Sequence, residues 1–151
     1  MNFNNFTIKS QEAVQEAVNL VQSRGQQAIE PEHLMAGLLK VGENVTNFIF
    51  QKLGINGQQI ETVLDRQIAS LPKVSGGEAY LSRSANEVLQ KALEVSKELG
   101  DEYVSLEALL LALLNVKSTV ATILKDAGLT DKELRAAIQE LRQGQKVTSQ
   151  S

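Results

Sequence analysis

Acidic and imidazole side chains stand at the beginnings of two predicted helices, and they are the chain's clearest candidates for chemistry. Glu32 and His33 lie in one predicted first turn, while Asp101 and Glu107 lie just before and just inside another. Carboxylates are common at such positions because they complement the positive end of the helix dipole. We therefore favour dipole compensation and local capping over catalysis for Glu32 and His33. For Asp101 and Glu107 this structural interpretation competes with a functional one, a polar rim that faces a partner protein.

The sequence lacks the motifs that support catalysis or cofactor binding. It has no G-x-x-x-x-G-K-[ST] loop for nucleotide phosphates and no G-x-S-x-G turn for a serine nucleophile. A single histidine and the lack of cysteine leave no zinc-type ligand set. We therefore expect this stretch of chain not to be an enzyme and to bind no cofactor or metal.

Charge and composition argue against several other classes of protein. The net charge is −3 and the Lys and Arg residues are scattered, whereas nucleic-acid binding needs a dense basic patch. No apolar stretch approaches the roughly 20 residues of a membrane span. The first residues, MNFNNFTIKS, lack the apolar core of a signal peptide. We expect a cytoplasmic protein with no nucleic-acid or membrane partner.

Helical periodicity runs through nearly the whole chain. Apolar residues recur at helical spacing, and Ser, Thr or Asn residues that can cap a helix precede most of the segments. An apolar fraction of 42% is enough to build a core. The predicted helices span residues 8–24, 31–40, 44–53, 56–70, 83–99, 106–115, 118–127 and 130–142. The predicted fold class is therefore all-α, with about eight helices.

One pattern of helices occurs twice in the sequence. A shift of 75 residues places residues 6–39 on 81–114, and a shift of 74 then aligns Gly54 with Gly128. Eight pairs are identical at the first shift: Glu12/Glu87, Gln15/Gln90, Ala17/Ala92, Gly25/Gly100, Glu32/Glu107, Leu34/Leu109, Leu38/Leu113 and Leu39/Leu114. A duplication this regular predicts one supersecondary unit used twice and packed on its own copy.

The predicted repeats cover residues 6–71 and 81–146, and together they form one domain over residues 1–146. Pro72 and the two glycines that follow it interrupt the helices between the repeats. Residues 147–151 are small, polar and unpatterned, which is typical of the start of a linker.

The apolar faces of the helices suggest where a partner could bind. The 106–115 segment is apolar nearly all round, which favours a place in the centre of the core. The 83–99 segment carries an apolar stripe that includes Val88 and Leu89, and its counterpart in the first repeat carries a similar one. We expect an apolar groove along these two helices, suited to apolar peptides.

Five segments together have the character of a known family: FTIKSQEAVQEAVNLVQSRG, IEPEHLMAGLL, INGQQIETVLDRQIASLPKVSG, GDEYVSLEALLLALL and ILKDAGLT. Through them the chain resembles the amino-terminal domains of ClpB-type disaggregases, AAA+ proteins of the Clp family. The resemblance covers essentially all 151 residues. It implies an all-α fold of two pseudo-symmetric Clp repeats that engages unfolded or aggregated polypeptides for threading by an AAA+ ring. An adaptor-docking module of the ClpA or ClpC type is the alternative.

The same resemblance implies particular residues and partners. It ties Thr7, Asp101 and Glu107 to chaperone activity, and Leu89 fits an apolar surface thought to touch the substrate protein. It implies ATP and Mg²⁺ in the full-length protein, in ATPase domains outside this fragment. It also implies a hexamer of the same chain and a cooperating chaperone system of the Hsp70 type.

Differences between the two repeats cluster around the short second helix of each. The pairs Gln26/Asp101, Glu30/Ser105 and His33/Ala108 break the symmetry there. We therefore expect the partner-facing site near the short helix of the second repeat, with Thr7 contributed by the first.

Overall fold

The computed structural model describes residues 2–151, and this part of the chain folds into eight α-helices and two very short strands. In repeat 1 the helices are α1 (Ile8–Ser23), α2 (Pro31–Val41), α3 (Glu43–Leu53) and α4 (Gly57–Ala69). In repeat 2 they are α5 (Arg83–Glu98), α6 (Leu106–Asn115), α7 (Thr119–Asp126) and α8 (Asp131–Arg142). The strands are β1 (Ala28–Ile29) and β2 (Tyr80–Leu81). The prediction of an all-α fold is confirmed.

Short polar side chains begin most of these helices, as the sequence predicts. A side-chain oxygen at the N-cap accepts a backbone N–H of the first turn in six helices. These caps are Thr7, Asn56, Ser82, Ser105, Ser118 and Thr130. At the other end, Gly25 and Gly100 follow the two long helices with φ values of +67° and +75°, a conformation that glycine adopts without steric cost.

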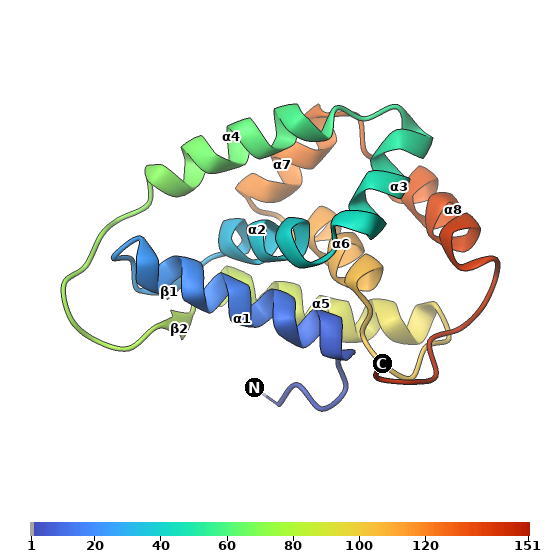
Figure 1. The fold of residues 1–151 in the computed structure, drawn as a ribbon, viewed down its shortest axis with the longest axis horizontal. Coiled ribbons are helices and arrows are strands. Elements are labelled where there is room, and N and C mark those ends of the chain that lie inside the picture. Colours follow the sequence, from blue (N-terminus) through green and yellow to red (C-terminus); the bar gives the residue numbers. More distant parts are fainter. Residues whose placement is uncertain (1) are drawn as a thin grey trace.

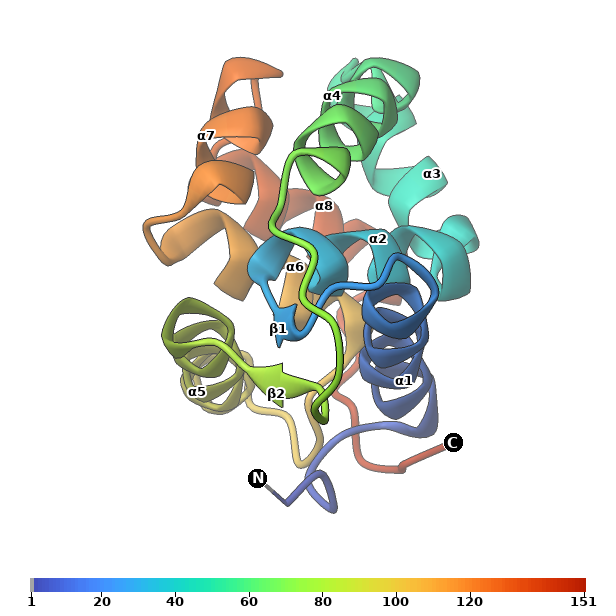
Figure 2. The same ribbon diagram turned by 90° about the vertical axis from the view of Figure 1, so that its left-hand side faces the viewer.

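The helices lie in three layers, with α2 and α6 in the middle (Figures 1 and 2). The long helices α1 and α5 cover one side of this pair, and each packs on the short helix of its own repeat. The other four helices cover the opposite side, where α3 packs on α8 and α4 packs on α7. These two packings join one repeat to the other across the outer layer, while α3 also contacts α4 within repeat 1.

Two short parallel backbone pairings join the repeats, and each involves segments that lie just before a helix. Ile29 of β1 pairs with Leu81 of β2, and Phe6 forms a bridge with Val104. These pairings are related by the same shift of 75 residues that aligns the sequences. The segment before each long helix thus pairs with the segment before the short helix of the other repeat. No helical periodicity marks these segments, so the apolar pattern of the sequence does not predict the pairings.

The central helix α6 is buried from Leu106 to Leu114. Eight of its leucine and alanine side chains are at most 6% exposed, which confirms its predicted place in the core. Within residues 2–151, no single helix is long and apolar enough to cross a bilayer; α6 and α7 reach that length and composition only as a pair bent by 98°.

Candidate functional site

A buried ionic cluster occupies the predicted site in repeat 2. Arg142, at the end of α8, donates from Nε to Glu107 Oε2 at 2.7 Å. Its Nη1 and Nη2 donate to both carboxylate oxygens of Asp101 at 3.0 and 2.8 Å, and Nη2 also reaches Ser105 Oγ at 2.9 Å. The side chains of Arg142, Asp101 and Glu107 are only 6%, 0% and 10% exposed. The three residues form a desolvated ionic triad, and its charge-assisted hydrogen bonds are stronger than those between neutral groups.

This cluster corrects the prediction made for the acidic pair. Asp101 and Glu107 do not form an exposed polar rim in this structure, because Arg142 takes up both carboxylates. Ser105 caps α6 by accepting the N–H of Ala108, so neither carboxylate is needed as the cap. Burial alone would lower the pKa of the Arg142 guanidinium, but the hydrogen bonds and charges of its two partners outweigh burial and raise that pKa.

Asp101 also holds the end of the described chain against the domain. The N–H of Val147 donates to Asp101 Oδ1 at 3.0 Å, and the N–H of Glu102 donates to the Val147 carbonyl at 2.8 Å. Further along, the carbonyl of Gln150 accepts the N–H of Ile8 at 2.8 Å. We refer to residues 146–151 as the exit segment of repeat 2. The residues expected to begin a linker are thus paired with both repeats here.

Repeat 1 has a neutral cluster at the matching position. Gln26, which aligns with Asp101, donates from Nε2 to the carbonyls of Ile68 and Leu71 at 2.7 and 3.4 Å. Its Oε1 lies 2.7 Å from His33 Nε2, while His33 Nδ1 accepts the N–H of Glu30. Nε2 therefore carries the proton, and the imidazole is neutral. Burial, with a smaller contribution from the charge of Arg24, lowers the pKa of His33 to about 4.

Glu32 lies beside this neutral cluster and is buried as well. Burial raises the pKa of its carboxyl group, and a backbone hydrogen bond opposes that effect. Glu30 and His33 form a reciprocal capping box at the start of α2. The predicted local role of His33 is therefore confirmed, although its ring is also part of a wider network.

Thr7 lies where the two repeats cross. Its hydroxyl accepts the N–H of Ser10 at the start of α1, and its own N–H donates to the carbonyl of Val104 at 3.0 Å. Only 9% of the residue is exposed. The structure thus brings Thr7 beside the loop that leads from Asp101 into α6, as expected, but in a structural position.

Leu89 contradicts the groove expected along the long helices. It is 0% exposed and belongs to the main core cluster, together with Val88 on the same helix. The apolar stripe of α5 packs inward because α6 covers it. In this conformation Leu89 can support a binding surface only from beneath.

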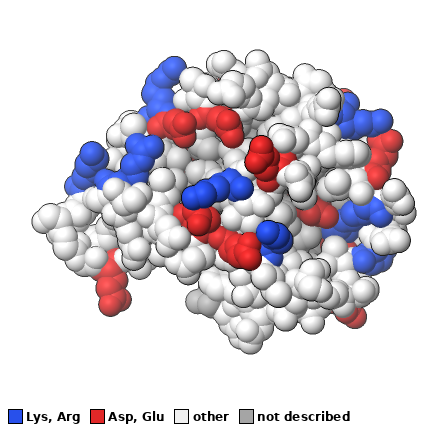
Figure 3. Space-filling view, in the orientation of Figure 1, with Lys and Arg blue, Asp and Glu red and all other residues white. Residues whose placement is uncertain are grey.

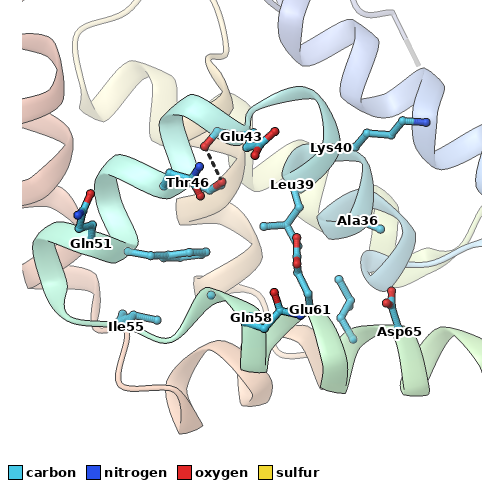
Figure 4. Close-up of a pocket in the computed structure, with 14 residues that line it drawn as sticks. Ala36, Leu39, Lys40, Glu43, Thr46, Gln51, Ile55, Gln58, Glu61 and Asp65 are labelled. Atoms are coloured by element: carbon cyan, nitrogen blue, oxygen red, sulfur yellow. Dashed lines mark hydrogen bonds between the residues drawn. The ribbon is translucent and has the colours of Figure 1, made fainter.

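An open hollow that the sequence analysis does not predict lies in repeat 1, between α2, α3 and α4 (Figure 4). Its volume is about 900 Å³. Five apolar residues line it: Ala36 and Leu39 are half-buried, whereas Phe50, Ile55 and Leu64 lie beneath them at 5%, 9% and 1% exposure. We call this hollow the repeat 1 groove. A groove of this size can accommodate several side chains of a bound peptide.

Acidic side chains dominate the edge of the repeat 1 groove. Glu43 begins α3, and in Figure 4 Glu61 and Asp65 rise from α4 toward α2. Lys40 points toward α1, where its Nζ lies 3.0 Å from Glu16 Oε2. Figure 3 shows acidic groups around the centre of this face, with basic side chains among them.

A second hollow of about 410 Å³ continues the groove between α1 and α2. It shares Ala36, Lys40 and Asp65 with the larger hollow, so the two hollows adjoin along α2. Its far end is lined by Ser23 and Arg24.

The chemical inventory of the site contains no reactive set. No group of three or more His, Asp or Glu side chains within residues 2–151 could hold a metal ion. The only histidine is buried and fully hydrogen-bonded. What the site offers is an apolar floor, an acidic edge and two internal polar clusters, an arrangement that suits binding.

The family of the Clp repeat (R) amino-terminal domain matches residues 5–127, and the chain belongs to that family. It is 80% identical over 151 residues to the chaperone protein ClpB of Bacteroides thetaiotaomicron. That match covers all of this chain but only 18% of the ClpB chain, so this chain spans about a fifth of its relative's length.

Solved structures share the fold at low sequence identity. The Hsp104 amino-terminal domain from Candida albicans superposes with a TM-score of 0.85 at 23% identity, covering 98% of each chain. A ClpV N-domain in complex with a VipB peptide gives a TM-score of 0.76 at 17% identity, covering 99% of this chain and 92% of that one.

Proposed function

We propose that this domain captures polypeptide segments in the repeat 1 groove and presents them to the AAA+ ring of a ClpB-type disaggregase. The observation that carries the proposal is the open groove of about 900 Å³ with an apolar floor. The 80% identity to a ClpB chaperone supports the setting. That another Clp-type N-domain of the same fold forms a complex with a peptide supports the mode of binding.

Binding of this kind is weak and broad. An apolar floor attracts exposed Leu, Val and Phe side chains of unfolded chains without demanding a particular hydrogen-bond pattern. Several domains on one ring would raise the avidity through effective concentration. In this proposal four residues support the fold rather than contact the substrate. Thr7 holds the crossing of the repeats, and Leu89 fills the core beneath α5. Asp101, with Glu107 in the same ionic cluster, holds the exit segment.

The work of disaggregation belongs to parts of the protein outside this chain. Within residues 2–151 there is no Walker-type phosphate loop and no group of three or more candidate metal ligands. In the whole protein we expect ATP and Mg²⁺ in ATPase domains of a cytoplasmic hexamer that cooperates with an Hsp70-type chaperone system. Residues 147–151 would lead toward those domains.

An NMR titration of the domain tests the proposal. We expect saturable chemical-shift changes at groove residues with several unrelated apolar peptides and with an unfolded protein. The variant Ala36→Leu, which installs the residue that repeat 2 has at this position, narrows the groove and should weaken these changes. A domain that ignores all of these ligands and binds one folded adaptor tightly would instead be a docking module of the ClpA or ClpC kind.

A further inference from the structure

The acidic edge of the repeat 1 groove has no partner within the domain. Among residues 2–151, the ion pairs include none with Glu43, Glu61 or Asp65. All three side chains are exposed, and all three line the groove. Glu43 begins α3, where its carboxylate complements the helix dipole, but Glu61 and Asp65 lie within α4 and have no such role.

The one cation that lines the repeat 1 groove does not neutralise its edge. Lys40 extends toward α1 and pairs with Glu16, on the far side from Glu61. Arg24 lines only the far end of the second hollow. The main hollow therefore combines an apolar floor with an uncompensated negative edge.

We propose that the repeat 1 groove selects polypeptide segments in which apolar residues are flanked by Lys or Arg. This inference rests on the proposed function and adds the class of segment that the groove prefers. The apolar side chains of the segment occupy the hollow against Ala36 and Leu39, the half-buried apolar residues of its lining. Its flanking cations reach Glu61 and Asp65 on α4 and Glu43 on α3.

Long basic side chains suit this geometry for a second reason. Their methylene stems can lie along apolar surface while the charged head stays in water beside a carboxylate. Aspartate or glutamate at the same flanking positions would face like charges, which costs affinity and slows association. The groove therefore discriminates by charge at its edge, whereas its floor accepts many apolar residues.

Three short synthetic peptides with the same central leucines test the proposal. They carry Lys, Ser or Glu at both flanks, and their affinities for the domain are measured by calorimetry at low and high salt. We expect the Lys-flanked peptide to bind about 5- to 10-fold more tightly than the Ser-flanked one, because each exposed ion pair contributes less than about 1 kcal/mol. The Glu-flanked peptide should bind most weakly, and salt should reduce the differences.

A matched pair of variants locates the effect. Glu61→Gln with Asp65→Asn should remove most of the difference in affinity between the Lys-flanked and Ser-flanked peptides, since of the three edge carboxylates only Glu43 then remains. The control is Glu87→Gln with Glu94→Gln on α5, which changes the net charge equally at exposed positions outside the groove. The control should keep the preference, and circular dichroism should show both proteins folded.

The outcomes separate this inference from the proposed function. If all three peptides bind equally and the α4 variant changes nothing, the charge preference is wrong while peptide capture stands. If the control variant abolishes the preference as fully as the α4 variant does, net charge rather than the groove explains it, and the inference fails. If no peptide of any charge binds, the proposed function itself is wrong.

Discussion

The face that carries the open groove in repeat 1 is closed in repeat 2. In repeat 2 a chain of polar contacts closes the face: Asn115 Nδ2 donates to Asp131 at 2.9 Å, and Arg135 bridges Asp131 and Glu98 at 2.9 and 2.8 Å. The matching positions in repeat 1 are Lys40, Gly57, Glu61 and Ser23, which form no such bridge. The groove is open where these contacts are missing.

Side-chain volume follows the same division. Ala36 in the groove matches the fully buried Leu111 of repeat 2, and Gly57 matches Asp131. A Cβ at Gly57 would lie 3.0 Å from the ring of Phe50, so the groove wall is already in close contact with the backbone there. Duplication thus supplies the backbone twice, and a handful of substitutions distinguish the repeat with the open groove from the other.

The polar clusters show a second contrast between the repeats, with a shared purpose. Gln26 in repeat 1 holds the carbonyls of Ile68 and Leu71, where the chain leaves that repeat. Asp101 in repeat 2 holds the N–H of Val147, again where the chain leaves. One cluster is neutral and the other ionic, yet each fixes an exit. We interpret Asp101 as a residue that positions the exit segment.

Removal of Arg142 should produce the largest loss of stability, because this residue is the cation that pairs with both buried carboxylates of the ionic cluster. Arg142→Met leaves two buried carboxylates without a cation, and we expect it to lower the free energy of unfolding by about 3–5 kcal/mol in urea titrations. The control Arg135→Met removes a 34% exposed guanidinium and should cost less than about 1 kcal/mol. Equal, small losses for both variants would show that burial of the cluster carries no energetic weight.

Leu89→Gln should be nearly as damaging. Leu89 and its match Val14 are both buried, so the apolar stripe that contains each of them faces the core. Placing an amide at Leu89 should lower the free energy of unfolding by about 3 kcal/mol through lost burial and an unsatisfied polar group. The same change at Ile8, which is 50% exposed, should cost under about 0.5 kcal/mol. An unchanged melting temperature for Leu89→Gln would return this residue to an exposed groove.

Local signals explain what the sequence could predict. The helices, their Ser and Thr caps and the duplication are all visible within a few residues of one another or at a constant shift. The all-α fold follows from them. The central position of α6 follows from its apolar composition all round.

Contacts between distant residues explain what the sequence could not predict. Arg142 lies 35 residues from Glu107 and 41 from Asp101, and nothing local marks it as their partner. The stripe of α5 could equally have faced a groove, because periodicity shows that a face is apolar but not what covers it. The repeat 1 groove depends on small residues whose effect appears only once α2, α3 and α4 are packed.

The contribution of the neutral cluster of repeat 1 to stability should depend on pH, because this cluster contains His33. The folded pKa of His33 is about 4 against an ordinary value of 6.5, so only the unfolded chain takes up a proton between these values. The contribution of neutral His33 to stability is therefore fully present above pH 6.5 and is lost as the pH falls toward 4. The stability advantage over His33→Gln should shrink by about 1 kcal/mol per pH unit in that window. Glu32 is present in both proteins and cancels in the difference; a constant difference would mean that the folded protein protonates His33 freely.

Release of the exit segment should have the smallest effect on global stability. Its effect should be confined to the residues that bind this segment. Val147→Pro removes the N–H that Asp101 accepts, while Val147→Ala keeps it. Loss of one hydrogen bond should cost about 1 kcal/mol. Amide exchange should speed up at Glu102 and Ile8, whose N–H groups donate to carbonyls of the exit segment. Arg142 still pairs with Asp101 in this variant, so faster exchange confined to these amides would show that the ionic cluster of repeat 2 fixes the exit segment. Unchanged exchange would show that the cluster only supports the interior, and the parallel with Gln26 would not hold.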